Sequence, residues 1–526
     1  MKIRIISLAN QQIDWPNWPT VLCCGVLALS CCTSRAEERA GVAPPPEQRQ
    51  LPLTAETARS GLHDALGKLQ QPDKAAVEST LLSVIAAPAF GALDASDQHA
   101  ALAAASGLAL GLAQPERAHE LAIRATAMSD QSISDWMVRV RAALALDDTA
   151  DALLCLTQLA GRWHSFDRLP DEVILRTAAS AARLNLDAPL LQMLKAVYAM
   201  RWHQAEDAEL DAMWLDLTRL LLAQGATDDA ADVAAHIVAP YAVIAMRADN
   251  RYREVRKSRF VNTDVRKAMA ADIDTRTSLV RSAPRSLIRA VTLAAVLLHA
   301  RRENDALALT TTVLDRVRSA APAVTAYDDA ERELPWILDV RSDALNQLGR
   351  YDEAVAQLQQ AVALALPTGH HVGERINLAH LLCTLDRPAE ALALLPGDKE
   401  VSAFGRMQIE IVRVMAATQQ VDAQAAEQAL SYLRLHQRDA PATLQSALLW
   451  AGKSDEAAQF LVARLQDGGL RIDALKELQE YSEPPAPPRM QEWRTRYRAL
   501  RERPEVRAAV RQVGTIERYS LAPPND

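Results

Sequence analysis

The chain has 526 residues, of which 49% are hydrophobic and only 4% aromatic, and its formal net charge at pH 7 is −8. This length is ample for a sizeable core, arranged as several domains or as one long repeat array, and the scarcity of β-branched and aromatic runs favours helices almost throughout. The negative charge gives no whole-chain electrostatic attraction to nucleic acid, so we expect no nucleic-acid partner.

Residues 1–32 have the pattern of an export signal. Lys2 and Arg4 are basic, and Val21 to Cys32 is an apolar run. The run is too short to span a bilayer as a helix, but it is typical of the apolar region of a signal peptide. Residues 33–54 are polar and proline-rich, which indicates a linker.

The end of the apolar run resembles a bacterial lipoprotein signal, in which cleavage leaves a lipidated cysteine. Cys31 and Cys32 are the two lipidation candidates. The resemblance implies a protein of the periplasm or cell envelope of a Gram-negative bacterium, with membrane contact only through a lipid anchor. The alternative is a cytoplasmic protein whose leader is not an export signal.

Only two cysteines, Cys155 and Cys383, lie in the body of the chain. Two cysteines so far apart do not make a disulfide framework, and no CxxC or Cys/His spacing indicates zinc. Both are expected to be small buried hydrophobic residues.

The helical pattern begins near residue 55 and repeats through residue 238, which predicts an N-terminal array of helical hairpins. Ala118 and Ala152 open the second helices of two successive hairpins, 34 residues apart, and Trp136 begins the first helix of the later one. Trp214, Gly225 and Ala230 repeat the pattern.

Residues 239–286 interrupt the period and carry a basic cluster with Tyr252 and Phe260 interleaved. This stretch is expected to be an irregular helical insert. A solvated helix face is the default interpretation, and the alternatives are a docking patch for an acidic protein or anionic lipid headgroups, or a nucleic-acid contact. The basic residues are Arg251, Arg253, Arg256, Lys257 and Arg259.

Residues 338–367 are the clearest helical hairpin in the chain. Gly349 stands where a helix ends in the left-handed conformation, Tyr351 opens the second helix, and Ala354 and Ala361 share its small-residue face. Gly225, Gly349 and Gly452 each precede an alanine by five residues, so one turn recurs. A second array is therefore predicted over residues 287–482.

The last stretch, residues 483–526, begins with a proline-rich break at Pro484 to Pro488 and continues into an arginine-rich helical segment. Because a solenoid needs a terminal helix with one polar face, this segment is expected to be a cap.

The hairpin pattern resembles the tetratricopeptide repeat family. The resemblance implies an all-α fold, an α-solenoid with a right-handed superhelix, in which small residues pack the hairpins together. The expected packing residues are Ala118, Ala152, Gly225, Ala230, Gly349, Tyr351, Ala354, Ala361, Ala391, Gly452 and Ala457.

The same resemblance implies that first helices line a concave surface that binds a protein or peptide segment. On the best repeat the candidate contacts are Asp339, Arg341, Asn346 and Gln347, with the basic cluster as a second candidate surface. The expected function is a non-enzymatic interaction scaffold of the cell envelope. The alternatives are a helical envelope protein that processes or binds glycans, and a cytosolic adaptor or regulator.

No short catalytic or cofactor motif is present: the chain contains no GxGxxG, GxxxxGK[ST], HExxH or GxSxG. His370, His371 and Glu374 have spacing that could hold a metal, but a loop followed by a first-turn glutamate explains them better. The sequence therefore predicts no catalytic residue, cofactor or metal site.

Overall fold

The computed structural model describes residues 54–166, 169–202, 210–320, 326–365, 372–397 and 401–524. Within these ranges the chain is all-α: the helices α1 to α25 are joined by short turns, and the only β-type pairings are two isolated bridges. Among the described residues, no helix is both long enough and apolar enough to cross a bilayer. The leader with Cys31 and Cys32 lies outside the described residues.

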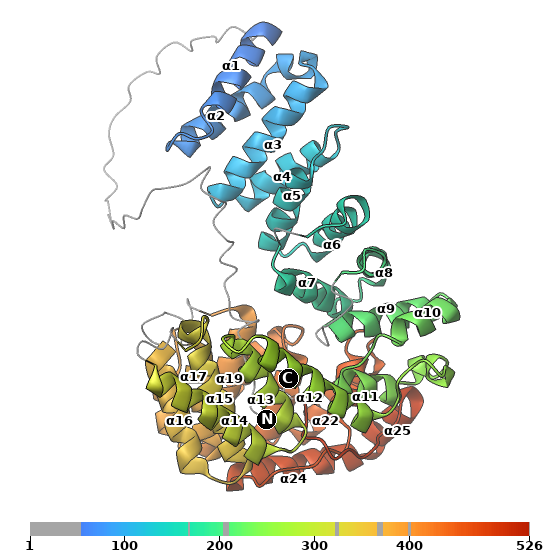
Figure 1. The fold of residues 1–526 in the computed structure, drawn as a ribbon, viewed down its shortest axis with the longest axis vertical. Coiled ribbons are helices and arrows are strands. Elements are labelled where there is room, and N and C mark those ends of the chain that lie inside the picture. The colour runs from blue at the N-terminus through green and yellow to red at the C-terminus, as the bar shows by residue number, and fades with distance from the viewer. Residues whose placement is uncertain are drawn as a thin grey trace. The chain divides into compact units, whose positions relative to one another are not determined.

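Two compact units make up the described chain (Figure 1). Residues 54–181 and 188–202 belong to an N-terminal unit, and residues 182–187 and 210–524 belong to a C-terminal unit. Each unit is a stack of α-helical hairpins, and each is described by itself below.

The N-terminal unit consists of four antiparallel hairpins. Many of its helices begin at a side-chain cap: Asp94 accepts a hydrogen bond from the backbone N–H of Asp97, and Ser132 forms a reciprocal capping box with Asp135. Neighbouring hairpins are tied by polar pairs, such as His99 to Asp135 at 2.8 Å. The helices are α1 (Ala55–Gly67), α2 (Lys74–Ala86), α3 (Ala95–Gly111), α4 (Pro115–Thr126), α5 (Ile133–Ala145), α6 (Thr149–Gln158), α7 (Asp171–Arg183) and α8 (Asp187–Ala199).

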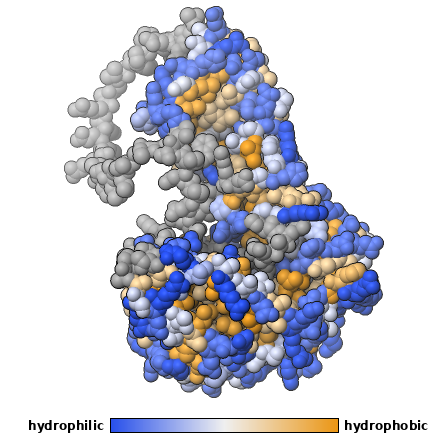
Figure 2. All heavy atoms as spheres, in the orientation of Figure 1, coloured by the Kyte–Doolittle hydropathy of each residue, from blue (hydrophilic) through white to orange (hydrophobic). Residues whose placement is uncertain are grey.

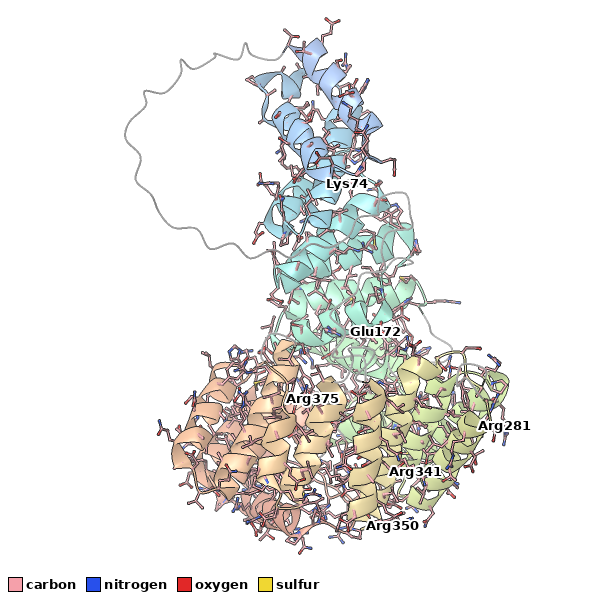
Figure 3. All side chains as sticks on the ribbon, turned by 90° about the vertical axis from the view of Figure 1, so that its left-hand side faces the viewer. Lys74, Glu172, Arg281, Arg341, Arg350 and Arg375 are labelled. Carbon is pink, nitrogen blue, oxygen red and sulfur yellow. The ribbon has the colours of Figure 1, made fainter. Side chains whose placement is uncertain are left out.

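The C-terminal unit continues the hairpin pattern around an irregular insert, and its helices stand side by side in Figure 3. Its first part runs through α9 (Asp211–Ala223), α10 (Thr227–Ala234), α11 (Pro240–Ala248), α12 (Val265–Ser282), α13 (Leu287–His299), α14 (Glu303–Ser319), α15 (Ala330–Gln347) and α16 (Tyr351–Ala365). Its second part runs through α17 (Val372–Thr384), α18 (Pro388–Leu394), α19 (Ala403–Gln419), α20 (Ala423–Leu435), α21 (Pro441–Trp450), α22 (Ser454–Gln466), α23 (Arg471–Glu477), α24 (Pro488–Glu502) and α25 (Pro504–Val513).

One turn geometry recurs in nine hairpins. In these described turns the second residue after the first helix takes a positive φ, and a buried residue follows five positions later. In eight of the nine, the next N–H bonds back to a carbonyl of the helix, as Arg350 N does to Leu345 O at 2.8 Å. The left-handed residues are Ala113, Asp147, Asn185, Gly225, Arg301, Gly349, Asp386, Val421 and Gly452. The buried residues that follow them are Ala118, Ala152, Leu190, Ala230, Ala306, Ala354, Ala391, Ala426 and Ala457.

The amphipathic helices bury one face and leave the other hydrated. On the face shown in Figure 2, hydrophilic residues cover most of both units, and hydrophobic residues show between them. The larger core of the C-terminal unit is built from α15 to α25 together with Ala248 of α11, and it is rich in leucine and alanine. Close packing of such small side chains is what lets adjacent hairpins approach one another.

The insert at residues 239–286 forms α11, two short 3₁₀ turns and α12. It is anchored on α9, because the Asp211 carboxylate accepts the backbone N–H of Val238 at 2.7 Å and Tyr252 donates to the carbonyl of Leu215 at 3.1 Å. The expected change of array near residue 239 therefore does not coincide with the division between the two units, since α9 and α10 belong to the C-terminal unit.

Residues 483–522 do more than cap the end of the solenoid. In α24, Arg489 pairs with Asp386 at 2.8 Å and Arg496 donates to the carbonyl of Trp450 at 2.8 Å, so this helix crosses the turns of earlier hairpins. The chain then returns to the start of the unit, where the N–H of Ala522 donates to the carbonyl of His299 at 2.9 Å. The C-terminal unit is thus closed by its own last residues.

Candidate functional site

Polar side chains gather on one face of four consecutive first helices, α15, α17, α19 and α21. The helices are linked along this face: Asn377 donates to Asp339 at 3.2 Å, and Gln408 donates to Thr443 at 2.9 Å. We call this set of side chains the inner face. It consists of Asp339, Asp343, Asn346, Asn377, His380, Gln408, Gln445 and Ser446.

The inner face is buried although it is polar. Asp339 is 1% exposed, His380 3% and Gln408 0%. Four of its atoms, the side-chain oxygens of Asn346, Gln408, Gln445 and Ser446, have no hydrogen-bond partner among the described residues. Since a buried polar group without a partner costs about 1–3 kcal/mol, a row of such groups points to a ligand or partner that supplies donors.

Part of the inner face lines a cavity of about 190 Å³ within the C-terminal unit. The opposite wall comes from the segment at residues 477–501, which includes Pro484 to Pro487, Trp493 and Tyr497. Trp493 donates to the carbonyl of Ser446 at 3.3 Å and stacks on Tyr497 with ring centroids 5.2 Å apart. This segment is therefore fixed against the ends of the first helices.

Glu374, at the start of α17, carries a strongly perturbed carboxyl group. Its side chain is 1% exposed, and burial, with the nearby Asp339 carboxylate adding to the effect, raises the pKa of Glu374 to about 8. In α19 the equally buried Glu410 has a different environment, because Arg406 and Arg413 bind it at 2.7 and 2.6 Å. Glu374 is thus held largely neutral at pH 7.

The four candidate contacts of the best repeat lie in different environments. Asn346 and Gln347 line the cavity. Asp339 lies on the inner face but is buried against Asn377, so its side chain is not exposed to solvent.

Arg341 corrects the sequence-based expectation. Its guanidinium donates to the carbonyl of Leu307 at 3.2 Å and to Thr311 at 2.6 Å, both in α14 (Figure 3 labels Arg341). It therefore lies in the interface between successive hairpins and not on the inner face. The two assignments differ because residues 341 and 339 are two positions apart, which places them on different sides of one helix.

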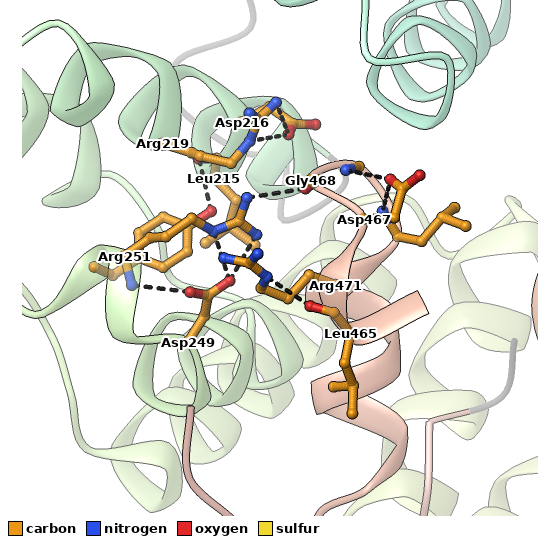
Figure 4. Close-up of polar contacts among 12 residues, drawn as sticks. Leu215, Asp216, Arg219, Asp249, Arg251, Leu465, Asp467, Gly468 and Arg471 are labelled. Atoms are coloured by element: carbon orange, nitrogen blue, oxygen red, sulfur yellow. Dashed lines mark hydrogen bonds and ion pairs between the residues drawn. The ribbon is translucent and has the colours of Figure 1, made fainter. Parts of the chain in front are cut away.

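The basic cluster of the insert does not form one patch. Arg251 binds the buried Asp249 carboxylate at 2.8 Å and donates to the carbonyl of Gly468 at 2.9 Å, which ties the insert to the turn before α23 (Figure 4). Arg256 donates to the carbonyl of Arg247.

The remaining three basic residues, Arg253, Lys257 and Arg259, are exposed. Lys257 pairs with Glu254 at 2.6 Å, and Arg259 lies over the ring of Phe260 at 4.7 Å. A wider cleft beside the insert is lined by charges that are paired as well, such as Arg247 with Glu517 at 3.0 Å. Arg251 and Arg256 therefore hold the insert in place, whereas Arg253, Lys257 and Arg259 lie at the surface.

The alanines expected to pack the hairpins together are buried. Ala118, Ala152, Ala230, Ala354, Ala361, Ala391 and Ala457 are all 0% exposed. Gly225, Gly349 and Gly452 have φ values of 78°, 77° and 71°, which confirms the left-handed turn expected at Gly349. Tyr351, at the start of α16, is half-buried.

Cys155 and Cys383 are buried thiols, and burial raises the pKa of both, to about 12 for Cys383. Across the described ranges no group of three or more His, Cys, Asp or Glu side chains is arranged to hold a metal ion. His370 and His371 lie outside those ranges.

The role of α24 is the main feature that the sequence analysis missed. Met490, Trp493, Tyr497 and Leu500 follow one another at three- and four-residue steps, and this apolar stripe was a readable signal for a helix that packs against the body. The arginine-rich composition of the segment hid it.

No protein-family model and no curated protein sequence matches the chain. Among solved structures, the chain is similar to yeast Tom70 (TM-score 0.25, 11% identity, 78% of this chain and 98% of that chain covered). It is also similar to the APC/C hetero-tetramer Cut9-Hcn1 (TM-score 0.25, 14% identity, 87% of this chain and 86% of that chain covered). A third similar structure is Naa15/Naa10 bound to HypK-THB (TM-score 0.22, 10% identity, 86% of this chain and 79% of that chain covered). These scores are too low to carry an argument about function, and the fold described above rests on this chain's own helices.

Proposed function

We propose that this chain is a non-enzymatic scaffold that binds a protein or peptide segment along the inner face of the C-terminal unit. The observation that carries the proposal is the row of polar side chains on the inner face, of which Asn346, Gln445 and Ser446 line the cavity with oxygens that lack partners among the described residues. Backbone N–H groups of an extended segment are donors that suit such acceptors.

The binding mechanism is display on a rigid frame. The hairpins are fixed by buried alanines, so the acceptors on successive helices keep their spacing without a partner. A preorganised surface loses less side-chain freedom on binding, which favours affinity. No bond-making or bond-breaking step is assigned to any residue.

The partner test is crosslinking in cells, followed by affinity purification of the full chain. Replacing Asn346 and Gln347 by alanine should reduce recovery of a crosslinked partner at least several-fold, because both side chains line the cavity end of the inner face. Gln428→Ala, an exposed residue of α20, is the matched control and should leave recovery unchanged. Equal recovery from all three proteins would exclude the inner face as the binding surface.

We further propose that the protein acts in the cell envelope. The support is the leader sequence, with its basic residues and the apolar run from Val21 to Cys32. Fractionation should show export that is lost when residues 21–32 are deleted, and a protein that stays in the cytoplasm with an intact leader would contradict the proposal. Replacing Cys31 and Cys32 by alanine should release the protein from the membrane fraction if it is lipidated.

A further inference from the structure

The 190 Å³ cavity at the end of the inner face lies between two parts of the C-terminal unit, and Ala522, Pro523 and Pro524 also line it. One wall comes from the first helices, with Asn346 and Gln445 among its residues. The other comes from α24 and the residues before it, with Trp493 and Pro485. A cavity of about 150 Å³ is enough to hold benzene, so this one has room for a six-membered ring with substituents.

Several of the charged groups around this cavity already have partners of opposite charge. The Glu477 carboxylate accepts a hydrogen bond from Arg464 at 2.9 Å, and Arg501 pairs with Glu480 at 3.2 Å. Arg494 lies 3.8 Å from Glu483. These pairs balance one another in charge and so do not demand a strongly charged ligand. The lining also contains the side chains of Asp343 and His380.

The polar atoms without a partner are mostly neutral. They are the amide oxygens of Asn346 and Gln445 and the hydroxyl of Ser446, with the Nε of Arg501 as a donor. Gln445 is 3% exposed and Ser446 1%, so neither is expected to be satisfied by bulk water. The set contains both acceptors and donors, which a ligand of hydroxyl groups matches because each hydroxyl both donates and accepts.

The cavity also has an aromatic wall. Trp493 and Tyr497 stack with an interplanar angle of 7°, and the indole is held in place by its bond to the carbonyl of Ser446. A flat, fixed aromatic pair offers an apolar surface for the C–H groups of a ring, beside amides and a hydroxyl for its polar edge.

We propose that this cavity binds a small, uncharged, polyhydroxylated molecule of about monosaccharide size, with its ring against Trp493 and its hydroxyls on Asn346, Gln445 and Ser446. This ligand differs from the protein partner proposed above, although both proposals use the side chains of Asn346, Gln445 and Ser446. Because the two walls belong to different parts of the unit, the bound ligand would hold α24 to the ends of α15 and α21.

The test is calorimetric and fluorescence titration of the full chain with glucose and N-acetylglucosamine as neutral probes, and with methylguanidinium and glucuronate as charged ones. At least one neutral probe should bind saturably and change tryptophan fluorescence. Ser446→Ala should weaken that binding about tenfold, since one hydrogen bond in a buried site contributes about 1.4 kcal/mol. Gln428→Ala is the matched surface control.

Three results would overturn the proposal: no saturable binding of either neutral probe, tighter binding of a charged probe, or unchanged affinity in the Ser446→Ala protein. Asn346→Ala provides a second variant that is independent of Ser446, because Asn346 lies at the end of α15 and is only partly buried. Circular dichroism and thermal unfolding of each variant separate lost binding from lost structure. Equal partner recovery from the natural chain and its inner-face variants, with sugar binding intact, would contradict the proposed function alone.

Discussion

The hairpin turns require a left-handed backbone conformation at single residues, including residues for which it is unfavourable. Val421, between α19 and α20, has φ 58° and is 87% exposed, so neither its side chain nor its surroundings favour this backbone conformation. A left-handed conformation costs an L-residue about 1–2 kcal/mol, and a β-branched side chain makes it worse. The position tolerates valine because the two helices on either side fix the turn.

We predict that Val421→Gly stabilises the C-terminal unit by about 1 kcal/mol. Relief of the left-handed strain outweighs the extra freedom that glycine gives the unfolded chain, which is worth about 0.5–1 kcal/mol. The midpoint of urea unfolding, followed by tryptophan fluorescence, should rise. The opposite type of substitution, Gly349→Ala at φ 77°, should lower the free energy of unfolding by about 1 kcal/mol because alanine is strained at this φ. This holds although a Cβ there would meet only Pro485 at 3.9 Å. A lower midpoint for Val421→Gly would show that the valine contributes contacts.

Glu374 gives a prediction about pH. The pKa of Glu374 is about 8 in the folded protein, against 4.5 for the unperturbed group, so the folded state binds the proton more tightly than the unfolded state. Stability should therefore fall as pH rises from 4.5 to 8, by up to about 1.4 kcal/mol per pH unit from this group. Glu374→Gln should remove this part of the pH dependence.

The measurement is urea unfolding of both proteins at pH 5 and pH 8. The variant should gain stability over the natural chain at pH 8 and show a much smaller difference at pH 5, where the unfolded carboxyl is also partly protonated. A difference that is the same at both pH values would mean that folding does not raise the pKa of Glu374.

At the scale of elements, the sequence predicts the existence of helices better than their roles. The hairpin expected at 338–367 is present as α15 and α16, with its turn at Gly349, but α15 begins earlier, at Ala330, and contains Pro335. Six of the nine recurring turns lack glycine. Asp147 and Asn185 belong to residue types that tolerate φ above zero, whereas Arg301 and Val421 give no local sign of it.

The candidate site was harder to predict, because it depends on contacts between distant segments. Asn346 and Gln347 were assigned to the right surface, but the wall formed by Trp493 lies well over a hundred residues further along the chain. Arg341 was misassigned because successive residues of a helix are rotated by 100°. A small error in assigning the helix face therefore places a residue in solvent when it contacts a neighbouring hairpin.

Arg341 and Asn346 should therefore have opposite effects when each is changed to alanine. Arg341→Ala removes hydrogen bonds to α14 and should lower unfolding free energy by about 1–3 kcal/mol, while partner recovery per folded molecule stays unchanged. Asn346→Ala should reduce partner recovery with little change in stability. Unfolding curves and crosslinking yields should be measured on the same preparations. If Arg341→Ala loses partner recovery while its stability is unchanged, Arg341 belongs to the binding surface.

At the scale of the C-terminal unit, closure by the last residues determines which surfaces a partner can reach. The segment after α25 pairs with both α11 and α13: Thr515 donates to the carbonyl of Ala248 at 2.9 Å, and Ala522 donates to that of His299 at 2.9 Å. Tyr241 of α11 also donates to the carbonyl of Ala522, at 2.7 Å. These bonds join the last residues of the unit to α11 and α13, which lie in its first part.

Removal of residues 514–526 should therefore loosen the beginning of the C-terminal unit. Loss of the contacts at Ala248 and His299 should speed amide hydrogen exchange in α11 and α13 by about tenfold or more, since each lost hydrogen bond contributes about 1 kcal/mol to holding the closed state. Exchange in α3 and α4 of the N-terminal unit should not change, because the closing bonds of Thr515 and Ala522 involve other helices. Tyr241→Phe, which removes only one of the closing bonds, should give a smaller effect in the same two helices. If α11 exchanges no faster in the shortened protein, the insert is held by its contacts with α9 and α23 alone, and closure by the C-terminus has no energetic role.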